Sequence, residues 1–418
     1  MKKLLILTLL LAMAETLSAA VSLTELYSQI DDAIAHSNEY VAEYEERISK
    51  VKDAYRQEAS VDRKFELAIQ LYELYKAYNN DSALSYIGRC ITWAEDNHRP
   101  EMAGHARALM AFQCSTSGMY IESRDLLQKT APALLTPQGR SAYYFAWMHL
   151  CGEIAYYSKI DHVQQHYYSL QSAYRDSVLN NISPTSLDYL MLRQTILLND
   201  GQLNEALKVN DTWQNAVAVG SHEHAIAAFY RNLVYDRMGR TDEAKICLAE
   251  SALDDIRCAV MDQASLITLA SLLNSDGDFQ RSYQYLRFTW DCNNRFSTRM
   301  RTWQISPIMT LVENNYQQAI EQNIQRLTTA FIVAGVLALL LLLALVYVAR
   351  QRSRYKQARN EVKSAYDQLS ATNEKLQLMN DLVVGYNKEL FEIKHQLEEA
   401  NRQLTGNKPI AIEATQDQ

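Results

Sequence analysis

The chain has 418 residues and a formal net charge of −8, and 48% of its residues are hydrophobic. Only 12 Gly and 6 Pro occur, so a protein with many β-turns is excluded and an all-α fold is predicted. Acidic and basic residues balance over 350–418, which argues against a DNA-binding module and predicts no direct contact with nucleic acid.

Residues 1–20 have the pattern of a signal peptide. Lys2 and Lys3 precede a short apolar run, and small residues stand at Ser18 and Ala20. We therefore predict cleavage after Ala20. The alternative is a retained anchor, but the run is short for a span and Glu15 interrupts it.

Residues 21–64 contain two helical patterns with apolar residues three or four apart. Charged side chains in EYEERISKVKD lie between the apolar positions and indicate a solvated face. We predict that this segment forms N-terminal capping helices, arranged as a hairpin that covers the start of the next segment.

Residues 65–326 repeat at a nearly constant interval. Each unit has an apolar helix, a turn that usually contains Gly, and a second helix with a small residue five positions after the turn. The turns fall at 78, 118, 158, 201, 239 and 277. A fixed period of this kind predicts stacked helix pairs rather than an irregular helical bundle with chance glycines, which is the alternative.

These units resemble the tetratricopeptide repeat. Trp147 and Leu150 match its aromatic and Leu positions in a first helix, and Ala206 and Ala244 match its small position in a second helix. The spacing here is longer than the 34 residues of that repeat. The resemblance implies a solenoid whose first helices line a concave surface that binds a protein or peptide.

Counting back from each turn gives the exposed positions of the first helices. These positions form a candidate partner groove, in which aromatic and Arg side chains would anchor a bound segment. For the aromatic members an ordinary place in the core is the alternative. The groove residues are His105, Phe112, Tyr156, Asn199, Asp236, Arg237 and Asn274.

Catalytic and metal-binding motifs are absent from the sequence, so we predict a protein that is not an enzyme and has no cofactor. His162 and His166 stand four apart and His222 and His224 flank a Glu, but neither group has a further obvious ligand. His395 faintly resembles the phosphoacceptor of sensor histidine kinases, yet no ATP-binding domain follows it. Six cysteines without CxxC spacing favour buried free thiols over disulfides.

Residues 327–349 form an uncharged apolar run between Arg326 and Arg350. Its length is enough to cross a hydrocarbon core of about 30 Å, and a buried soluble helix is the alternative. Five basic residues follow the run before any acid, so we predict that 350–418 are cytoplasmic and the repeats extracytoplasmic. These basic residues would also contact membrane lipid headgroups.

Residues 350–405 carry a heptad pattern that predicts a cytoplasmic coiled coil, with a homodimer as the favoured form. A single amphipathic helix that binds another partner is the alternative. Residues 406–418 lack a pattern and are predicted to be disordered. The coiled-coil seam consists of Val362, Leu369, Leu376, Val383, Leu390, Leu397 and Leu404.

Several segments, among them HLCGEIAYYSK and RTWQISPIM, resemble a group of bacterial envelope regulators with a signal peptide, tetratricopeptide-like repeats, one span and a coil. The resemblance implies a membrane-anchored sensor of the cytoplasmic membrane with a cytoplasmic protein partner. A static envelope scaffold is the alternative.

Overall fold

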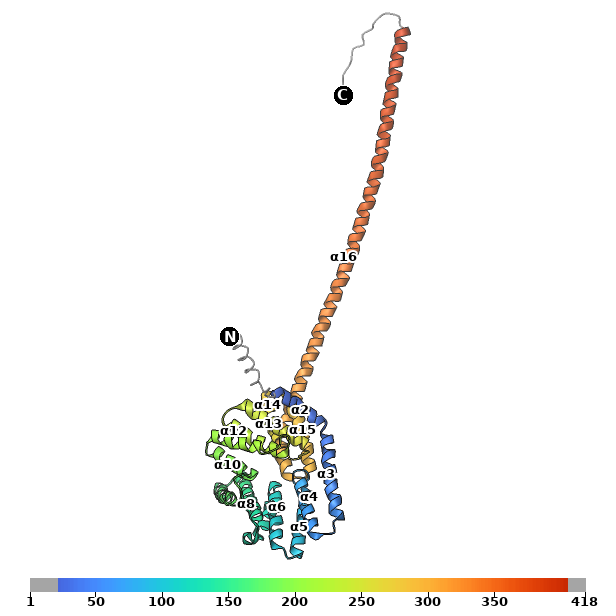
Figure 1. Cartoon of the computed structure of the whole chain (residues 1–418). Coiled ribbons are helices and arrows are strands. Elements are labelled where there is room, and N and C mark those ends of the chain that lie inside the picture. Colours follow the sequence, from blue (N-terminus) through green and yellow to red (C-terminus); the bar gives the residue numbers. More distant parts are fainter. Residues whose placement is uncertain (1–21, 405–418) are drawn as a thin grey trace, which may run out of the picture. The chain divides into compact units, whose positions relative to one another are not determined.

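The computed structural model describes residues 22–404, and every secondary-structure element in that range is helical (Figure 1). The predicted all-α class is therefore confirmed. The signal peptide predicted at 1–20 and the tail predicted at 406–418 lie outside the described residues. The chain divides into two compact units, 1–322 and 323–418.

The first unit contains six helix pairs that follow the predicted period. The first helices of the pairs are α4 (Val61–Tyr75), α6 (Pro100–Thr116), α8 (Pro137–Tyr157), α10 (Leu187–Asn199), α12 (His222–Arg237) and α14 (Ala264–Asp276). The second helices are α5 (Asn80–Asp96), α7 (Tyr120–Gln128), α9 (Asp161–Leu179), α11 (Leu203–Asn215), α13 (Thr241–Arg257) and α15 (Phe279–Phe296). A short 3₁₀ helix, η1 (Pro132–Leu134), lies between α7 and α8.

Glycine occupies the turn in four pairs because the backbone there is left-handed. Gly118, Gly201, Gly239 and Gly277 have φ angles of 83°, 73°, 72° and 87°. A side chain added at the last three would meet no neighbouring atom within 4 Å, so backbone conformation rather than space requires the glycine.

The small residue five positions after each of these turns is buried. Ala206 and Ala244 let the second helix lie close to the first. Ser123 and Ser282 occupy the same position, and each hydroxyl donates a 2.7 Å hydrogen bond to a carbonyl of the first helix. Small size is therefore the shared requirement at this position, and a hydroxyl is satisfied locally when it is present.

The N-terminal helices, α2 (Leu23–Ala35) and α3 (Ser37–Gln57), do not form the expected hairpin. Ile48 of α3 packs on α4 and α5, as a cap on the first pair would. Ile30 of α2 instead joins a core made by α13, α14, α15 and the start of α16. The two helices thus contact opposite ends of the repeat array.

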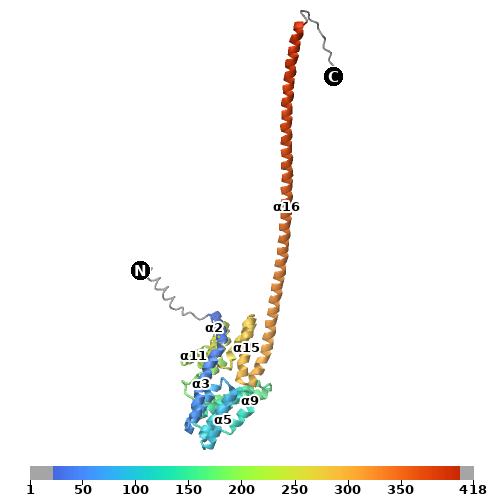
Figure 2. The same cartoon turned by 90° about the vertical axis from the view of Figure 1, so that its right-hand side faces the viewer.

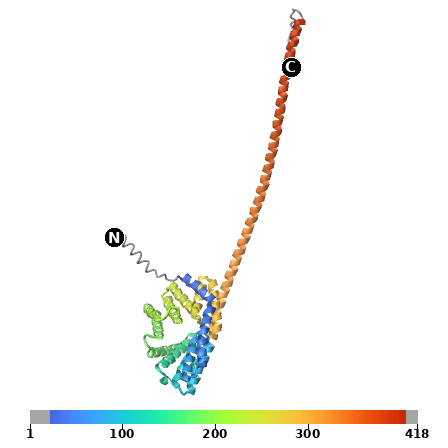
Figure 3. The same cartoon turned by 45° about the vertical axis from the view of Figure 1, so that its right-hand side comes forward.

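The array closes on itself where its first and last pairs meet, a place we call the closure seam. The amide N–H of Met261 donates a 2.8 Å hydrogen bond to the carbonyl of Ala77, and Asn79 donates to the carbonyl of Arg295. Phe296 packs here with Met261 and partly buried neighbours from α3 and the first turn. Figure 3 shows the helices curving from cyan through green to yellow and orange, back beside the blue α3.

All six cysteines are free thiols, as the sequence indicated; five are buried and Cys258 is partly buried. Each lies in a described helix or immediately after one. Burial raises the pKa of Cys90, Cys151 and Cys292 to about 12, so these thiols are poor nucleophiles at neutral pH.

The second unit consists, where the structure describes it, of the continuation of α16 (Arg299–Leu404). Among the described residues this is the one helix long and apolar enough to cross a membrane, with a mean hydropathy of 3.0 in its most apolar window. All residues from 323 to 404 are exposed in the single chain. The apolar stretch is therefore not a buried core helix of the described protein.

Candidate functional site

Three titratable side chains at the ends of first helices, or just after one, lie near one another. Lys76 follows α4, Asp188 lies in the first turn of α10, and His222 begins α12. The positive charge of Lys76 bears on the pKa values of both Asp188 and His222. Charges more than one hundred residues apart in sequence are thus neighbours across the array.

Asp188 is the member of this group whose pKa is raised by burial. Its side chain is exposed to solvent, yet burial by surrounding protein raises its pKa, with Lys76 opposing the change. Burial also lowers the pKa of His105, and the charge of Glu73 opposes this.

Two histidines at the start of α12 pair with aspartates of α13. Nδ1 of His222 is 2.7 Å from Oδ1 of Asp255, and Nδ1 of His224 is 2.6 Å from Oδ2 of Asp254. Burial lowers the pKa of His222, but its bond to Asp255 outweighs this and the net pKa is raised. The bond to Asp254 raises the pKa of His224. These two pairs link α12 to α13.

No group of three His, Cys, Asp or Glu side chains between residues 22 and 404 is arranged to hold an ion. His162 and His166 are exposed on α9.

Three predicted groove residues are already engaged by the fold. His105 lies against the start of α8, where its Cβ is 3.4 Å from a Cβ built on Gly139. Phe112 packs edge-on to His149, with ring centroids 4.8 Å apart. Asn274 accepts a 3.0 Å hydrogen bond from Asn315 of α16. These side chains contribute to packing between helices.

The other four predicted groove residues are exposed. Tyr156 has an exposed fraction of 67%, and Asn199, Asp236 and Arg237 are also exposed. They lie at the C-terminal ends of α8, α10 and α12, next to the turns. They therefore form separate points along successive first helices.

Sequence reasoning missed the residues that the closure brings together. Neither Lys76 nor Asp188 is among the predicted groove residues. Nothing local distinguishes them, because their proximity depends on the curvature of the whole array.

Comparison with known families accords with this architecture. The family model described as the SusR N-terminal TPR domain matches residues 34–307, well over half of the chain. The chain belongs to this family. No curated protein matches the sequence.

The matched SusR N-terminal TPR domain begins at the end of α2 and finishes within α16. It therefore includes all six helix pairs and the closure seam. Figure 2 shows α3, α5, α9 and α15 of this range. Tetratricopeptide domains generally mediate protein interactions and are typically not enzymes. Most of α2, which contacts the last pairs, lies outside the matched range, as do the apolar stretch and the heptads.

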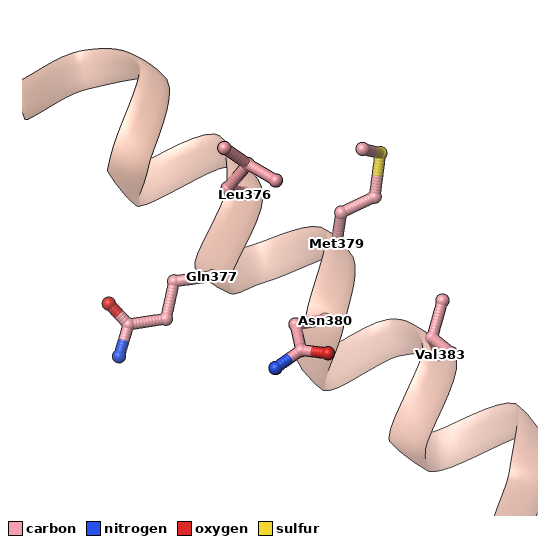
Figure 4. Close-up of a pocket in the computed structure, with 5 residues that line it drawn as sticks. All are labelled: Leu376, Gln377, Met379, Asn380 and Val383. Carbon is pink, nitrogen blue, oxygen red and sulfur yellow. The ribbon is translucent and has the colours of Figure 1, made fainter. Parts of the chain in front are cut away.

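The predicted coil seam is a row of exposed side chains that follows the SusR N-terminal TPR domain in the sequence. All seven seam residues are exposed by 52% or more in the single chain. Figure 4 shows Leu376, Met379 and Val383 on one side of α16, while Gln377 and Asn380 point away. The shallow recess between these side chains is the surface of one helix.

Proposed function

We propose that this protein is a membrane-anchored regulatory receptor. Its repeat array binds a protein or peptide outside the cytoplasmic membrane, and a dimeric coil on the cytoplasmic side transmits the change to a protein partner. Membership of the SusR N-terminal TPR domain family supports the binding role of the array.

The observation that carries the proposal is the composition of α16. This single helix contributes Val312 to the core of the last pairs, contains the apolar stretch 327–349, and ends in the heptads. On this proposal the binding domain, the span and the association seam follow one another in the order of the sequence. A receptor needs this order, because a change in the array must reach the cytoplasm through the span.

The basic residues after the apolar stretch support the orientation. Arg350, Arg352 and Arg354 follow it directly, whereas the twelve residues before it carry only Glu321 and Arg326. The side richer in Lys and Arg stays in the cytoplasm. The same residues are suited to contact anionic lipid headgroups.

The exposed groove residues are the proposed contact points for the partner. Tyr156 and Arg237 combine large area with directional hydrogen bonding, which are the properties of interface anchors. We expect Tyr156→Ala and Arg237→Ala to reduce the proteins labelled by a biotin ligase fused at the outer end of α16. Arg257→Ala is the matched control, because Arg257 is an exposed Arg that ends a second helix. Unchanged labelling with both variants folded would contradict this assignment.

A static scaffold is the alternative function. It predicts outer partners but no cytoplasmic partner that depends on the coil. Proximity labelling from both faces of the membrane separates the two. A receptor shows cytoplasmic labelling that disappears when the coil seam is disrupted, whereas a scaffold retains its full set of labelled proteins.

A further inference from the structure

A cavity of about 210 Å³ lies at the closure seam. Its lining comes from the start of α3, the end of α13 with the loop after it, and the last turns of α15. These segments lie far apart in sequence, and each is fixed by contacts of the seam. The loop carries Ala259 with a φ angle of 55°, a left-handed conformation that is unusual for Ala.

One wall of the cavity is apolar. Val41 of α3, Met261 of the loop and Phe288 of α15 line it, and Met261 is only 3% exposed. The volume is below the range of about 300–1,000 Å³ that accommodates drug-sized ligands. The wall therefore suits a short aliphatic group rather than a long chain or a folded segment.

Opposite charges stand beside this wall. Asp291 and Arg295 line the cavity from α15 and are four residues apart, which places them one turn apart on the same side of the helix. They form no ion pair with each other. Among the residues whose side chains the structure describes, Asp291 pairs with Arg287 at 3.8 Å, and the guanidinium of Arg295 has no hydrogen bond or ion pair.

We propose that this cavity binds a small zwitterion with an apolar tail, of the class of an apolar α-amino acid. Its ammonium donates to Asp291, its carboxylate accepts from Arg295, and its tail packs on Val41, Met261 and Phe288. Side chains one helical turn apart have Cβ atoms about 5–6 Å apart, and charge-assisted hydrogen bonds span about 2.7–2.9 Å. An ammonium and a carboxylate attached to one carbon atom fit between the side chains of Asp291 and Arg295. Asn38, on the rim at the start of α3, supplies a further polar contact.

A ligand in this cavity contacts the N-terminal helix, the loop after α13 and the last helix of the array at once. Binding therefore favours the closed array and raises its unfolding temperature. This site is separate from the proposed partner groove. Its occupancy does not depend on whether the protein signals.

The direct test is calorimetric titration of the full chain in lipid nanodiscs with L-valine, L-leucine and L-methionine. At least one is expected to bind and to raise the unfolding temperature. N-acetyl-L-leucine lacks the ammonium and 3-methylbutylamine lacks the carboxylate, so each is expected to bind at least tenfold more weakly than leucine. No binding by any of the three amino acids, or equal binding by either analogue, overturns the proposal.

Substitutions of Arg295 and Asp291 test the two proposed charged contacts. Arg295→Gln and Asp291→Asn are each expected to weaken binding at least tenfold. The seam hydrogen bond from Asn79 uses the carbonyl of Arg295 and survives the substitution. Arg287→Gln is the control, because Arg287 is one turn away on α15 and does not line the cavity. Unchanged affinity in the Arg295 variant overturns the proposal.

A native thiol gives an independent readout without mutation. Cys292 lines the cavity, while Cys90 is buried in the first pair, away from it. The bound amino acid is expected to slow alkylation of Cys292 more than that of Cys90, as measured by mass spectrometry at each cysteine. Equal slowing of both thiols would indicate general stabilisation and contradict binding at this cavity.

Discussion

The Nδ2 of Asn79 donates a 2.9 Å hydrogen bond to the carbonyl oxygen of Arg295, 216 positions further along the chain. The Oδ1 of the same side chain accepts a 3.0 Å hydrogen bond from the amide of Ser82 and caps α5. One amide group thus begins a helix of the first pair and holds the end of the last pair. The two ends of the array are therefore joined by a specific contact and not only by apolar packing.

Asn79→Asp keeps the cap and removes the donor, so it tests the closure alone. We expect a loss of about 0.5–1.5 kcal/mol, the usual contribution of one hydrogen bond. Hydrogen exchange should increase together at residues 77–80 and 292–298. Ser60→Asp, which exchanges one capping oxygen for another on α4, is the control. An increase confined to 77–80 would show that the ends do not open together.

A second prediction concerns the docking of α2 on the last pairs. The hydroxyl of Tyr285 donates a 2.9 Å hydrogen bond to Asp31, and the guanidinium of Arg281 lies 3.1 Å from the same carboxylate. We expect Asp31→Ala to cost about 1–3 kcal/mol, because it removes one partner from two groups at once. Limited proteolysis should then cleave between α2 and α3 more rapidly.

Asp32→Ala is the matched control for this prediction. Asp32 is the next residue, is 71% exposed at its side chain, and pairs only with His36. An exposed pair of this kind contributes little to stability. Equal effects of the two substitutions would mean that the Asp31 contacts do not hold α2.

The third prediction is a pH dependence from the two His–Asp pairs. Because folding raises the pKa of His222 and His224, their contribution is fully present below the ordinary value of about 6.5 and is lost as pH rises through the folded-state values. The unfolding temperature of the wild type should therefore fall between pH 6 and pH 8. Lys76, Glu223, Glu250 and Asp262 also act on these two pairs and set the midpoint.

A double variant, His222→Gln with His224→Gln, should lose most of this pH dependence and roughly 1–3 kcal/mol of stability at pH 6. His166→Gln, an exposed His on α9, should retain the dependence of the wild type. The measurement is thermal unfolding of the full chain in nanodiscs. A double variant that keeps the wild-type slope would show that other groups cause it.

The fourth prediction concerns the coil. Leu376→Asp with Val383→Asp places like charges opposite each other in a homodimer, and burying unpaired charge costs several kcal/mol, on the order of what a short coil can lose. Cross-linking in membranes through a cysteine engineered at Leu390 should disappear, while the outer array stays folded. Gln377→Asp with Asn380→Asp, on the side that points away, is the control. Persistent cross-linking in the seam variant would mean that the heptads do not form a homodimer.

The fifth prediction concerns topology. A reporter active only outside the cytoplasm should work when fused near residue 315, and one active only inside should work when fused after residue 360. The physical reason is the cluster of basic residues directly after the apolar stretch. The opposite activities would reject the proposed orientation.

The amino-acid pattern alone was enough to predict the helix pairs, because the features that define them are local. A left-handed turn requires glycine at Gly201, and close contact of two consecutive helices requires a small residue at Ala206. Both requirements act within ten residues and leave a visible period. The apolar stretch and the heptads are equally local, since length and spacing define them.

Only the tertiary structure decided that the array closes and that α2 contacts its far end. Asn79 reaches Arg295, and Asp31 reaches Tyr285, across more than two hundred residues. Small rotations between successive pairs add up to this closure, and no single residue encodes them. The same curvature engages Asn274 with α16 and places Lys76 near Asp188, so which polar side chains are neighbours depends on geometry summed over all six pairs.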